Sequence, residues 1–467
     1  MSLQRGEEVG LGRWSWWLGA AAAVLAFIFL KYRLLELGPG RVFPDTLEYV
    51  RVAGLPITDA AFWGSLRPPI LPLLYKLLAV GPDNYELASI IGQVGSAQTL
   101  ISCAAWIALA GVVGSLMRIR WLQSAAFVAM LAFGLNLHVA QWDAVLLSES
   151  LATSLFVAWL GTFLLLVHKR RSGAGVGRLA SVSLELALGL LSLLLALVRD
   201  LNAYLMLGML GLAVVGLLTP IIRTKAKNLL VVMLPVFILA GVLSVVSSNH
   251  GQRWKIPLLG VLHERIFTNA QATAFFESAG MPVGKWEKVP VTREGRAFFL
   301  SMVQYDPEAE PFEHWIESRG RMVYANYLLT HPRALIGGPL RHVPKLLSPN
   351  STEYRGPLAE SPRWLVWMTA LLFPMDVWIE IALILLVLAA MGWQLKRGVG
   401  KGWWAVPVAL LAISPLLLGF VWHADSIEVE RHAYPIAMQV RLAAWILAFG
   451  VVDSIILSGS SEMTENG

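Results

Sequence analysis

Long apolar runs separated by short polar segments are the main feature of the chain. A helix needs about 17–25 apolar residues to cross a hydrocarbon core that is about 30 Å thick. About ten runs approach or exceed this length. They are Trp14–Leu30, Ala88–Leu116, Trp121–Leu137, Ala144–Val167, Leu179–Val198, Ala203–Leu218, Leu229–Val246, Trp364–Gln394, Trp403–Val421 and Tyr434–Leu457. The pattern predicts an all-α polytopic membrane protein with about ten transmembrane helices.

One apolar stretch is too short to belong to this set. Ile70–Val80 follows two prolines and is only half as long as a membrane-spanning helix requires. We expect it to form an interfacial or re-entrant helix on the outer side of the membrane.

The basic residues set the orientation of the predicted helices. They gather in every second short loop and near the N-terminus, which makes that side cytoplasmic by the positive-inside rule. The basic positions concerned are Arg5, Arg13, Arg118, Arg120, Lys169, Arg170, Arg171, Arg178, Arg223, Lys225, Lys227, Lys396, Arg397 and Lys401. Both termini are then predicted inside. The chain carries no endoplasmic-reticulum retention signal, which favours a bacterial inner membrane.

The spacing of the runs divides the chain into four parts. Residues 1–248 form an N-terminal transmembrane module that includes a first extracytoplasmic loop, 31–87. A long extracytoplasmic segment, 249–363, lies between the seventh and eighth spans and is predicted to cap the outer surface. Residues 364–457 supply the C-terminal transmembrane helices, and the polar tail 458–467 is predicted to be disordered.

Composition supports the membrane assignment and excludes other classes. Hydrophobic residues make up 56% of the 467 residues and charged residues only 15%, with a mean hydropathy of +0.62. These values exclude an ordinary soluble protein. The net charge of +6 comes from the loops between apolar runs, so it does not indicate nucleic-acid binding. A single cysteine, Cys103, excludes an intramolecular disulfide.

The first outer loop contains a pair of acids beside aromatic residues. Asp45 and Glu48 share one face if the segment is helical, where they can act as a general base or as metal ligands. Alternatively, Asp45 caps the helix and Glu48 occupies the third helical position. Tyr49, one residue further on, adds an aromatic ring to the same segment.

Several arginines at the outer ends of the spans are candidates for binding a phosphate. Arg67 precedes two prolines that fix the local backbone, so its guanidinium can be held in place for two hydrogen bonds. Pairing with lipid headgroups is the alternative. The same phosphate role is assigned to Arg199, Arg431 and His432, for which pairing with neighbouring acids or a solvated loop is the alternative.

Three further residues complete the candidate site. Glu149 lies within an apolar run, where an unpaired charge is costly, so it is expected to face a cavity or a partner as a second acid. A favourable interaction with the helix dipole explains it equally well. The other two are polar residues on the predicted outer side, Asp143 on the turn before this span and His263 in the long outer segment.

These residues lie in short motifs with a family resemblance. In order and in outer placement, the motifs resemble the GT-C superfamily of integral-membrane glycosyltransferases. The likeness is to the branch of the dolichyl-phosphate-mannose protein mannosyltransferases and the lipid A aminoarabinose transferases. The motifs are Phe43–Tyr49 (FPDTLEY), Arg67–Pro72 (RPPILP), Ser148–Ser150 (SES), Tyr327–Arg333 (YLLTHPR) and Glu430–Pro435 (ERHAYP).

The resemblance implies a GT-C-like fold and a specific reaction. A sugar moves from a polyprenyl-phosphate donor to an acceptor hydroxyl on a lipid, glycan or protein, at the extracytoplasmic side and with inversion. Asp45, Glu48 and Glu149 are then the catalytic acids, and Asp45 is the candidate ligand if a divalent metal ion takes part. The arginines and His432 hold the leaving phosphate, and Tyr49, Asp143 and His263 are candidates for binding the acceptor or the sugar. Membrane lipids surround the protein. A transporter or flippase of lipid-linked sugars is the alternative.

Overall fold

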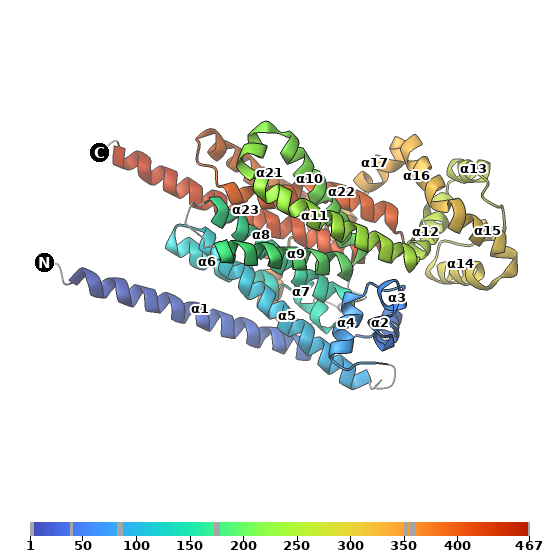
Figure 1. The fold of residues 1–467 in the computed structure, drawn as a ribbon, viewed down its shortest axis with the longest axis horizontal. Coiled ribbons are helices and arrows are strands. Elements are labelled where there is room, and N and C mark those ends of the chain that lie inside the picture. The colour runs from blue at the N-terminus through green and yellow to red at the C-terminus, as the bar shows by residue number, and fades with distance from the viewer. Residues whose placement is uncertain are drawn as a thin grey trace.

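The computed structural model describes residues 4–37, 41–81, 87–171, 178–349, 354 and 361–465. All regular elements in these ranges are helices. They form an elongated bundle with both ends of the chain at one end of the long axis and a helical cap at the other (Figure 1). The prediction of an all-α polytopic protein is confirmed.

Nine helices in the described ranges are long and apolar enough to cross a membrane. They are α1 (Gln4–Leu37), α5 (Leu87–Leu116), α8 (Ser148–Arg171), α9 (Arg178–Val198), α10 (Asp200–Leu218), α11 (Pro220–His250), α21 (Val377–Lys396), α22 (Ala405–Ala424) and α23 (Val429–Glu465). A tenth crossing is bent by 49° where α6 (Arg120–Leu135) meets α7 (Leu137–Ala140) and η2 (Gln141–Ala144). The predicted number of spans is therefore reached only when this bent pair counts as one.

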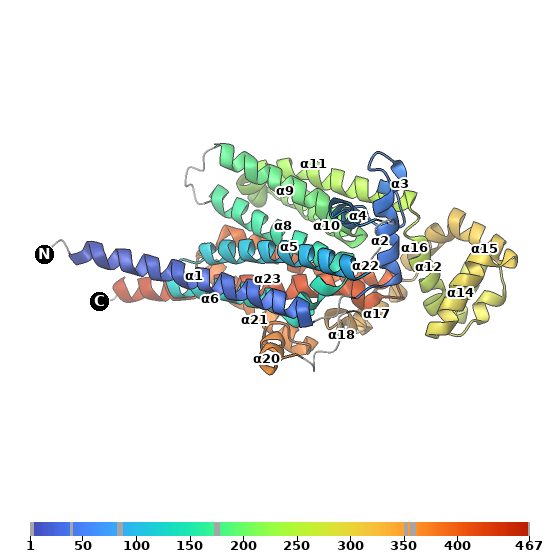
Figure 2. The same ribbon diagram turned by 90° about the horizontal axis from the view of Figure 1, so that it is seen from below.

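The eighth predicted span, Trp364–Gln394, is wrong as a single helix. A short helix α20 (Arg363–Leu372) ends before α21 begins at Val377. Between them, Pro374 cannot donate a backbone hydrogen bond, and the Asp376 side chain accepts from the first amides of α21. Hydropathy is continuous across this break, which is why the sequence pattern did not indicate it. Figure 2 shows α20 at the margin of the bundle.

Two further comparisons with the sequence pattern concern short or terminal segments. The stretch Ile70–Val80 forms a short helix α4 (Ile70–Leu77), as its length predicted, and its residues Ile70, Leu71 and Tyr75 are buried. The tail predicted to be disordered from residue 458 continues as part of α23 to Glu465.

Helix α8 lies at the centre of the bundle. Its apolar window is 83% buried, against 11% for α1 at the periphery, because α5 and α9 pack on opposite sides of it. The bundle also contains a close approach of α6 to α5, where a methyl group at Gly134 would lie 2.7 Å from the Trp106 ring. Close packing of this kind fixes the relative positions of the helix ends that carry the polar residues.

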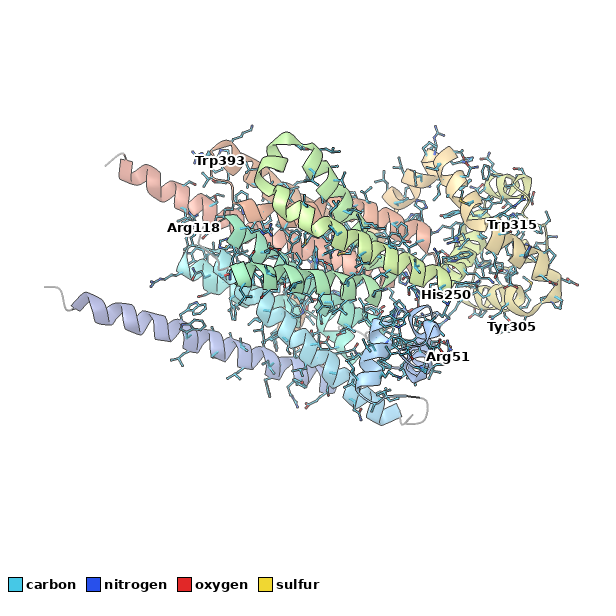
Figure 3. All side chains as sticks on the ribbon, in the orientation of Figure 1. Arg51, Arg118, His250, Tyr305, Trp315 and Trp393 are labelled. Carbon is cyan, nitrogen blue, oxygen red and sulfur yellow. The ribbon has the colours of Figure 1, made fainter. Side chains whose placement is uncertain are left out.

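The two ends of the bundle differ in their chemistry. At the end near both termini, the buried carboxylate of Asp453 accepts from the backbone amides of Arg118 and Ile119 at 2.9 and 3.0 Å and pairs with Lys401. Figure 3 places Arg118 and Trp393 toward this end and Arg51 and His250 toward the other. The basic turns around Arg118 and Lys401 therefore share one end, as the positive-inside pattern predicted.

The cap has a hydrophobic core of its own. The cap comprises α12 (Lys255–Val261), η3 (Leu262–Ile266), α13 (Ala270–Ser278), η4 (Lys285–Lys288), α14 (Arg293–Tyr305), η5 (Pro307–Ala309), α15 (Glu310–Trp315), η6 (Ile316–Gly320), α16 (Arg321–Thr330) and α17 (Pro332–Arg341). Phe276, Phe299 and Phe312 are among its fully buried side chains. The following helix α18 (Val343–Leu347) packs instead on the bundle core.

Arg253 joins the cap to the bundle. Its guanidinium donates to both carboxylate oxygens of Asp200 at 2.8 Å and to the carbonyl of Ser65 at 2.9 Å. Two parallel bonds from an arginine to a carboxylate fix orientation as well as distance. The first outer loop, the start of α10 and the start of the cap are therefore connected at one point.

Candidate functional site

Asp45 lies at the start of a helix in the first outer loop. Helix α2 (Pro44–Gly54) begins after Phe43, so Asp45 is its second residue and not its cap, and Glu48 is not the third. Thr46 occupies the third position instead, where its hydroxyl accepts from the Phe43 amide at 3.1 Å and donates to the Leu146 carbonyl at 3.0 Å. The capping alternative for Asp45 is wrong, and its carboxylate is free to bond elsewhere.

Arg67 approaches Asp45 from the segment between α3 (Ala60–Trp63) and α4. Its Nη2 lies 2.5 Å from Asp45 Oδ1, and Ser65 donates to the Arg67 carbonyl at 2.7 Å. The guanidinium carbon stands 5.7 Å from the centre of the Tyr49 ring. Burial raises the pKa of Tyr49, and the positive charge of Arg67 opposes this shift. The two prolines that follow Arg67 thus hold it against an acid and an aromatic face.

Glu149 occupies the first turn of α8 with its side chain fully buried. An extended segment precedes it, because Arg41 and Val145 form a parallel bridge that holds the residues before α8. The Glu149 carboxylate accepts from Arg431 and lies 3.0 Å from Nη1 of Arg199. Its side chain is 0% exposed, so two arginines balance a charge that water does not reach.

Arg431 joins these residues into one cluster. Besides Glu149, its guanidinium lies 3.1 Å from Asp45 Oδ2 and 2.8 Å from Glu428 Oε2. We call this group the charge cluster. Its members are Asp45, Arg67, Glu149, Arg199, Glu428 and Arg431. The cluster therefore holds three arginines and three carboxylates that come from five separate segments of the chain.

Two residues at the edge of the charge cluster complete its surroundings. The Tyr354 hydroxyl donates to Glu428, and its ring lies 5.1 Å from the Arg431 guanidinium and 5.0 Å from the Phe43 ring. His432, 33% exposed, has its Nδ1 3.3 Å from Asp425. Burial raises the pKa of Tyr354 well above its usual value, helped by the negative charge of Glu428. Sequence reasoning missed Tyr354, because a lone tyrosine in an outer segment carries no distinctive signal.

Tyr49 and His432 lie at the edge of the charge cluster, against Arg67 and Glu428, and three other sequence-predicted site residues lie away from it. Glu48 pairs with Arg51 at 2.9 Å on the outer face of α2, one turn along from Asp45. His263 is buried in the cap core, where its ring stacks on Phe299 at 4.8 Å and its Nε2 lies 3.2 Å from the Val289 carbonyl. Neither residue contacts a member of the cluster in any interaction of the described ranges.

Asp143 is the third of these residues, and it is buried beside the charge cluster. It pairs with Lys31 of α1 at 2.7 Å and accepts from the Ser150 hydroxyl at 2.6 Å. Lys31 also donates to Ser102 at 3.0 Å. Ser150 directly follows Glu149, so Asp143 positions the first turn of α8 and has no open side from which to bind an acceptor.

The charge cluster does not fit a divalent metal ion as it stands. Such ions need several oxygen ligands that are free of other cations. Each oxygen of Asp45 already accepts from an arginine, and Glu149 faces two arginines. Within the described residues, no group of three or more histidine, cysteine, aspartate and glutamate side chains is placed to hold a metal ion.

Comparison with known proteins gives one likeness. No protein-family model matches the chain, and no curated protein sequence does. Among solved structures, the chain is similar to the archaeal oligosaccharyltransferase AglB from Archaeoglobus fulgidus, in complex with an inhibitory peptide and a dolichol-phosphate. The TM-score is 0.47 at 15% identity, over 95% of this chain and 52% of that one, so the chain spans about half the length of that protein.

Proposed function

We propose that the protein is a membrane glycosyltransferase. It would transfer a sugar from a polyprenyl-phosphate donor to an acceptor hydroxyl, with inversion at the sugar carbon. One observation carries the proposal. Three arginines meet three carboxylates at the end of the bundle opposite the basic turns, and Arg431 touches acids from two distant segments as well as Glu428 of its own segment.

The arginines of the charge cluster would bind the donor phosphate. A guanidinium matches phosphate oxygens with two parallel hydrogen bonds, and charge-assisted bonds of this kind are among the strongest in proteins. Arg67 Nε is buried without a hydrogen bond to any described residue, so Arg67 has donor capacity left over. When phosphate binds, Arg67 would exchange its bond with Asp45 for one with a phosphate oxygen.

This exchange would activate Asp45. A carboxylate with both oxygens bonded to arginines cannot take up a proton from an acceptor at the same time. Once Arg67 has turned to the phosphate, Asp45 would remove the acceptor proton as the acceptor oxygen forms its bond to the sugar carbon. The bond from that carbon to the phosphate oxygen breaks on the opposite face. Arg431 and Arg199 would stabilise the charge on the departing polyprenyl phosphate.

The remaining parts of the structure support the proposal. Glu149 holds Arg431 and Arg199 in place from a fully buried position. The basic turns lie at the far end of the bundle, so the positive-inside rule assigns the charge cluster to the extracytoplasmic side and both termini to the cytoplasm. The cap would limit access of water to the donor. The acceptor class, lipid, glycan or protein, and a bacterial inner-membrane location remain predictions from the sequence.

Mutation of Asp45 and Arg67 tests the proposal. The purified protein is placed in vesicles with labelled polyprenyl-phosphate sugars and with lipid, glycan and peptide acceptors. Asp45→Asn is expected to lower transfer by about 100- to 10,000-fold, and Arg67→Ala by about 100- to 1,000-fold. Asp59→Asn and Arg51→Ala are matched controls in the same loop, because Asp59 only caps α3 and Arg51 pairs with Glu48. Wild-type transfer in both test variants would rule out these roles.

The same transfer assay tests whether a divalent metal ion takes part in the reaction. Because arginines face the carboxylates of the charge cluster, we expect transfer to continue at the wild-type rate after chelation with EDTA. Loss of transfer that added Mg²⁺ or Mn²⁺ restores would show that a carboxylate leaves its arginine to bind the ion. It would also return Asp45 to the role of metal ligand that the sequence suggested.

A transporter of lipid-linked sugars is the second candidate, and the interrupted helices favour it. Discontinuous spans often form transport sites near the middle of the membrane. Two breaks lie side by side here, since the Leu137 amide at the bend of α6 and α7 donates to Thr369 of α20 at 3.1 Å. Flipping of labelled lipid across vesicles without transfer to any acceptor would support this candidate over the enzyme.

A further inference from the structure

Helix α17 lies against the lipid-facing side of α22, at the level where that span ends. Nε2 of His423 lies 2.7 Å from the Leu335 carbonyl of α17, and α22 ends one residue later, at Ala424. Leu416, two helical turns before His423 on the same face of α22, is 74% exposed within the apolar span. Two turns rise about 10 Å. Helix α17 therefore covers the outward side of α22 at the membrane surface (Figure 1).

Close packing holds one side of α17 on α22. A methyl group at Gly338 would lie 2.5 Å from Nε1 of Trp422, so a larger residue there would push the two helices apart. The His342 ring stacks on the Trp422 ring, with 4.0 Å between their centroids. Gly338 and His342 are one turn apart and lie on the same side of the chain's helical path. The opposite side of α17 therefore faces away from the bundle.

The outward side of α17 combines apolar and basic side chains. Ile336 and Leu340, one turn apart, are 56% and 65% exposed. Arg333 and Arg341 are exposed beside them, and no acid among the described residues pairs with either one. Arg341 donates only from Nε to the Gly337 carbonyl, at 3.0 Å, so the rest of its guanidinium points outward. Basic and apolar side chains on one outward surface are typical of helices that lie in a bilayer interface.

The motif Tyr327–Arg333 leads the chain from the cap to this position. Tyr327 of α16 packs against the cap core, and its ring stacks on His331 at 4.5 Å. The His331 amide donates to the Tyr327 carbonyl at 2.9 Å, which completes the last turn of α16. Pro332 then begins α17, because proline cannot donate to the carbonyls of the preceding turn. The motif thus ends one helix in the cap and starts the next at the membrane surface.

We propose that α17 binds the bilayer surface and that Arg333 and Arg341 bind the headgroups of anionic phospholipids there. Ile336 and Leu340 enter the upper part of the acyl chains. A guanidinium matches two oxygens of a lipid phosphate, and an anionic surface attracts basic residues that lie within a Debye length of it. The inference requires only that α22 spans a membrane, so it holds for a transferase and for a transporter.

Fluorescence quenching in nanodiscs tests where α17 lies. In a Cys103→Ala background, which removes the only cysteine, Ile336→Cys and Leu340→Cys are labelled with bimane. The quenchers are aqueous iodide and phospholipids that carry a nitroxide near the headgroup end of the acyl chain. Leu416→Cys is the lipid-facing control. Tyr305→Cys, on the cap away from the bundle (Figure 3), is the water-facing control and is equally exposed, at 73%.

We expect the lipid nitroxide to quench the probes at Ile336 and Leu340 as it quenches the probe at Leu416. Iodide should quench only the probe at Tyr305. Quenching of both α17 probes by iodide and not by lipid would overturn the inference, because α17 would then face water. Protection from both quenchers would also contradict it, since protein would then cover this side of α17.

A second comparison tests the role of the arginines. The nitroxide is carried by anionic phosphatidylglycerol or by zwitterionic phosphatidylcholine at equal mole fractions. Phosphatidylglycerol should quench the Leu340 probe about two- to fivefold more strongly, because surface arginines concentrate anionic lipid around them. Arg333→Gln with Arg341→Gln should abolish this preference, as should about 1 M NaCl. Arg293→Gln with Arg319→Gln, which changes two exposed arginines elsewhere on the cap, is the matched control and should keep it.

Two results would remove the anionic headgroups from the inference. One is equal quenching of the Leu340 probe by the two lipids in the wild type. The other is a preference that survives both the double substitution and high salt, because the charge of the arginines would then not be its source. Neither result depends on sugar transfer, so failure here and failure of the proposed function are separate outcomes.

Discussion

Helix α23 carries two buried arginines whose surroundings differ. Arg431 lies at its outer end and contacts carboxylates of α2 and α8 and that of Glu428, which directly precedes α23. Arg441 lies ten residues further into the membrane and pairs with a single acid, Glu380 of α21, at 2.6 Å. Both side chains are almost inaccessible, at 5% and 1% exposure. Burial alone therefore does not distinguish them, but their partners do.

The remaining bonds of Arg441 go to the protein backbone. Its guanidinium donates to the carbonyls of Ala437 at 3.0 Å and Pro374 at 2.7 Å, and it stacks on the Phe373 ring at 3.9 Å. Pro374 belongs to the break between α20 and α21. Trp445 of α23 donates to the carbonyl of Leu372, at the end of α20, at 3.2 Å. In the membrane these carbonyls have no water to bond with, so Arg441 and Trp445 stabilise the break.

The comparison separates a site that can exchange ligands from one that is closed. Asp45 and Glu149 each have two arginine partners, so one arginine can turn to a phosphate while the other still pairs with the acid. Arg441 bonds to one acid and to fixed backbone carbonyls, so a ligand could bind it only by breaking the contacts that hold α20, α21 and α23 together. An arginine in a membrane protein is a functional candidate by default, but its set of partners decides the case.

Of the variants that test this comparison of Arg431 with Arg441, Arg431→Lys should have the largest effect on activity. Lysine keeps the positive charge but cannot reach several acids with a planar fork, so transfer should fall by about 100- to 1,000-fold. The protein should still fold, because Arg199 and the new lysine continue to balance Glu149. Vesicle transfer and thermal unfolding are measured together. Wild-type transfer in this variant would show that a positive charge at this position is sufficient for activity. The set of acidic partners would then not distinguish Arg431 from Arg441.

Arg441→Leu should lower the stability of the protein and leave transfer by the folded protein unchanged. Removal of one partner leaves Glu380 buried with an uncompensated charge, which typically costs about 3–5 kcal/mol of stability. The double variant Arg441→Leu with Glu380→Leu should recover most of this loss, because apolar residues often replace a buried ion pair well. The rate at which a thiol reagent labels the buried Cys103 on heating reports unfolding. Remaining folded protein should retain wild-type transfer, and a specific loss of turnover would place Arg441 in the reaction.

The same contrast shows what the sequence could predict. Apolar runs predicted most of the spans, because the thickness of the bilayer sets the length of a span. The orientation inferred from the basic turns stays a prediction. Glu149 and Arg431 could be singled out because a charge beside apolar residues needs a partner. The break before α21 escaped prediction, since Pro374 interrupts a segment of uniform hydropathy.

The positions of Asp143 and His263 away from the charge cluster escaped prediction for a different reason. Sequence position placed both on the outer side, but it did not show which direction each side chain faces. Lys31 of α1 pairs with Asp143 although the two residues are 112 positions apart in the sequence. No local sequence pattern indicates such a contact. His263 lies within the cap, whose separate core was not visible in its mixed composition.

Asp143 gives the smallest expected effect and the finest test of the comparison. Its pair with Lys31 is closed like that of Arg441, yet it bonds to Ser150 beside Glu149. Asp143→Asn can still accept from Ser150 but loses the ion pair, so we expect kcat to fall about tenfold with KM unchanged as Glu149 shifts slightly.

Addition of Lys31→Met to Asp143→Asn separates positioning from stability. The double variant no longer buries an unpaired lysine, so its thermal stability should return toward the wild type. Its kcat should stay low, because the contact that orders the first turn of α8 is still weakened. Recovery of kcat together with stability would show that the Lys31–Asp143 pair stabilises the bundle and does not position the charge cluster.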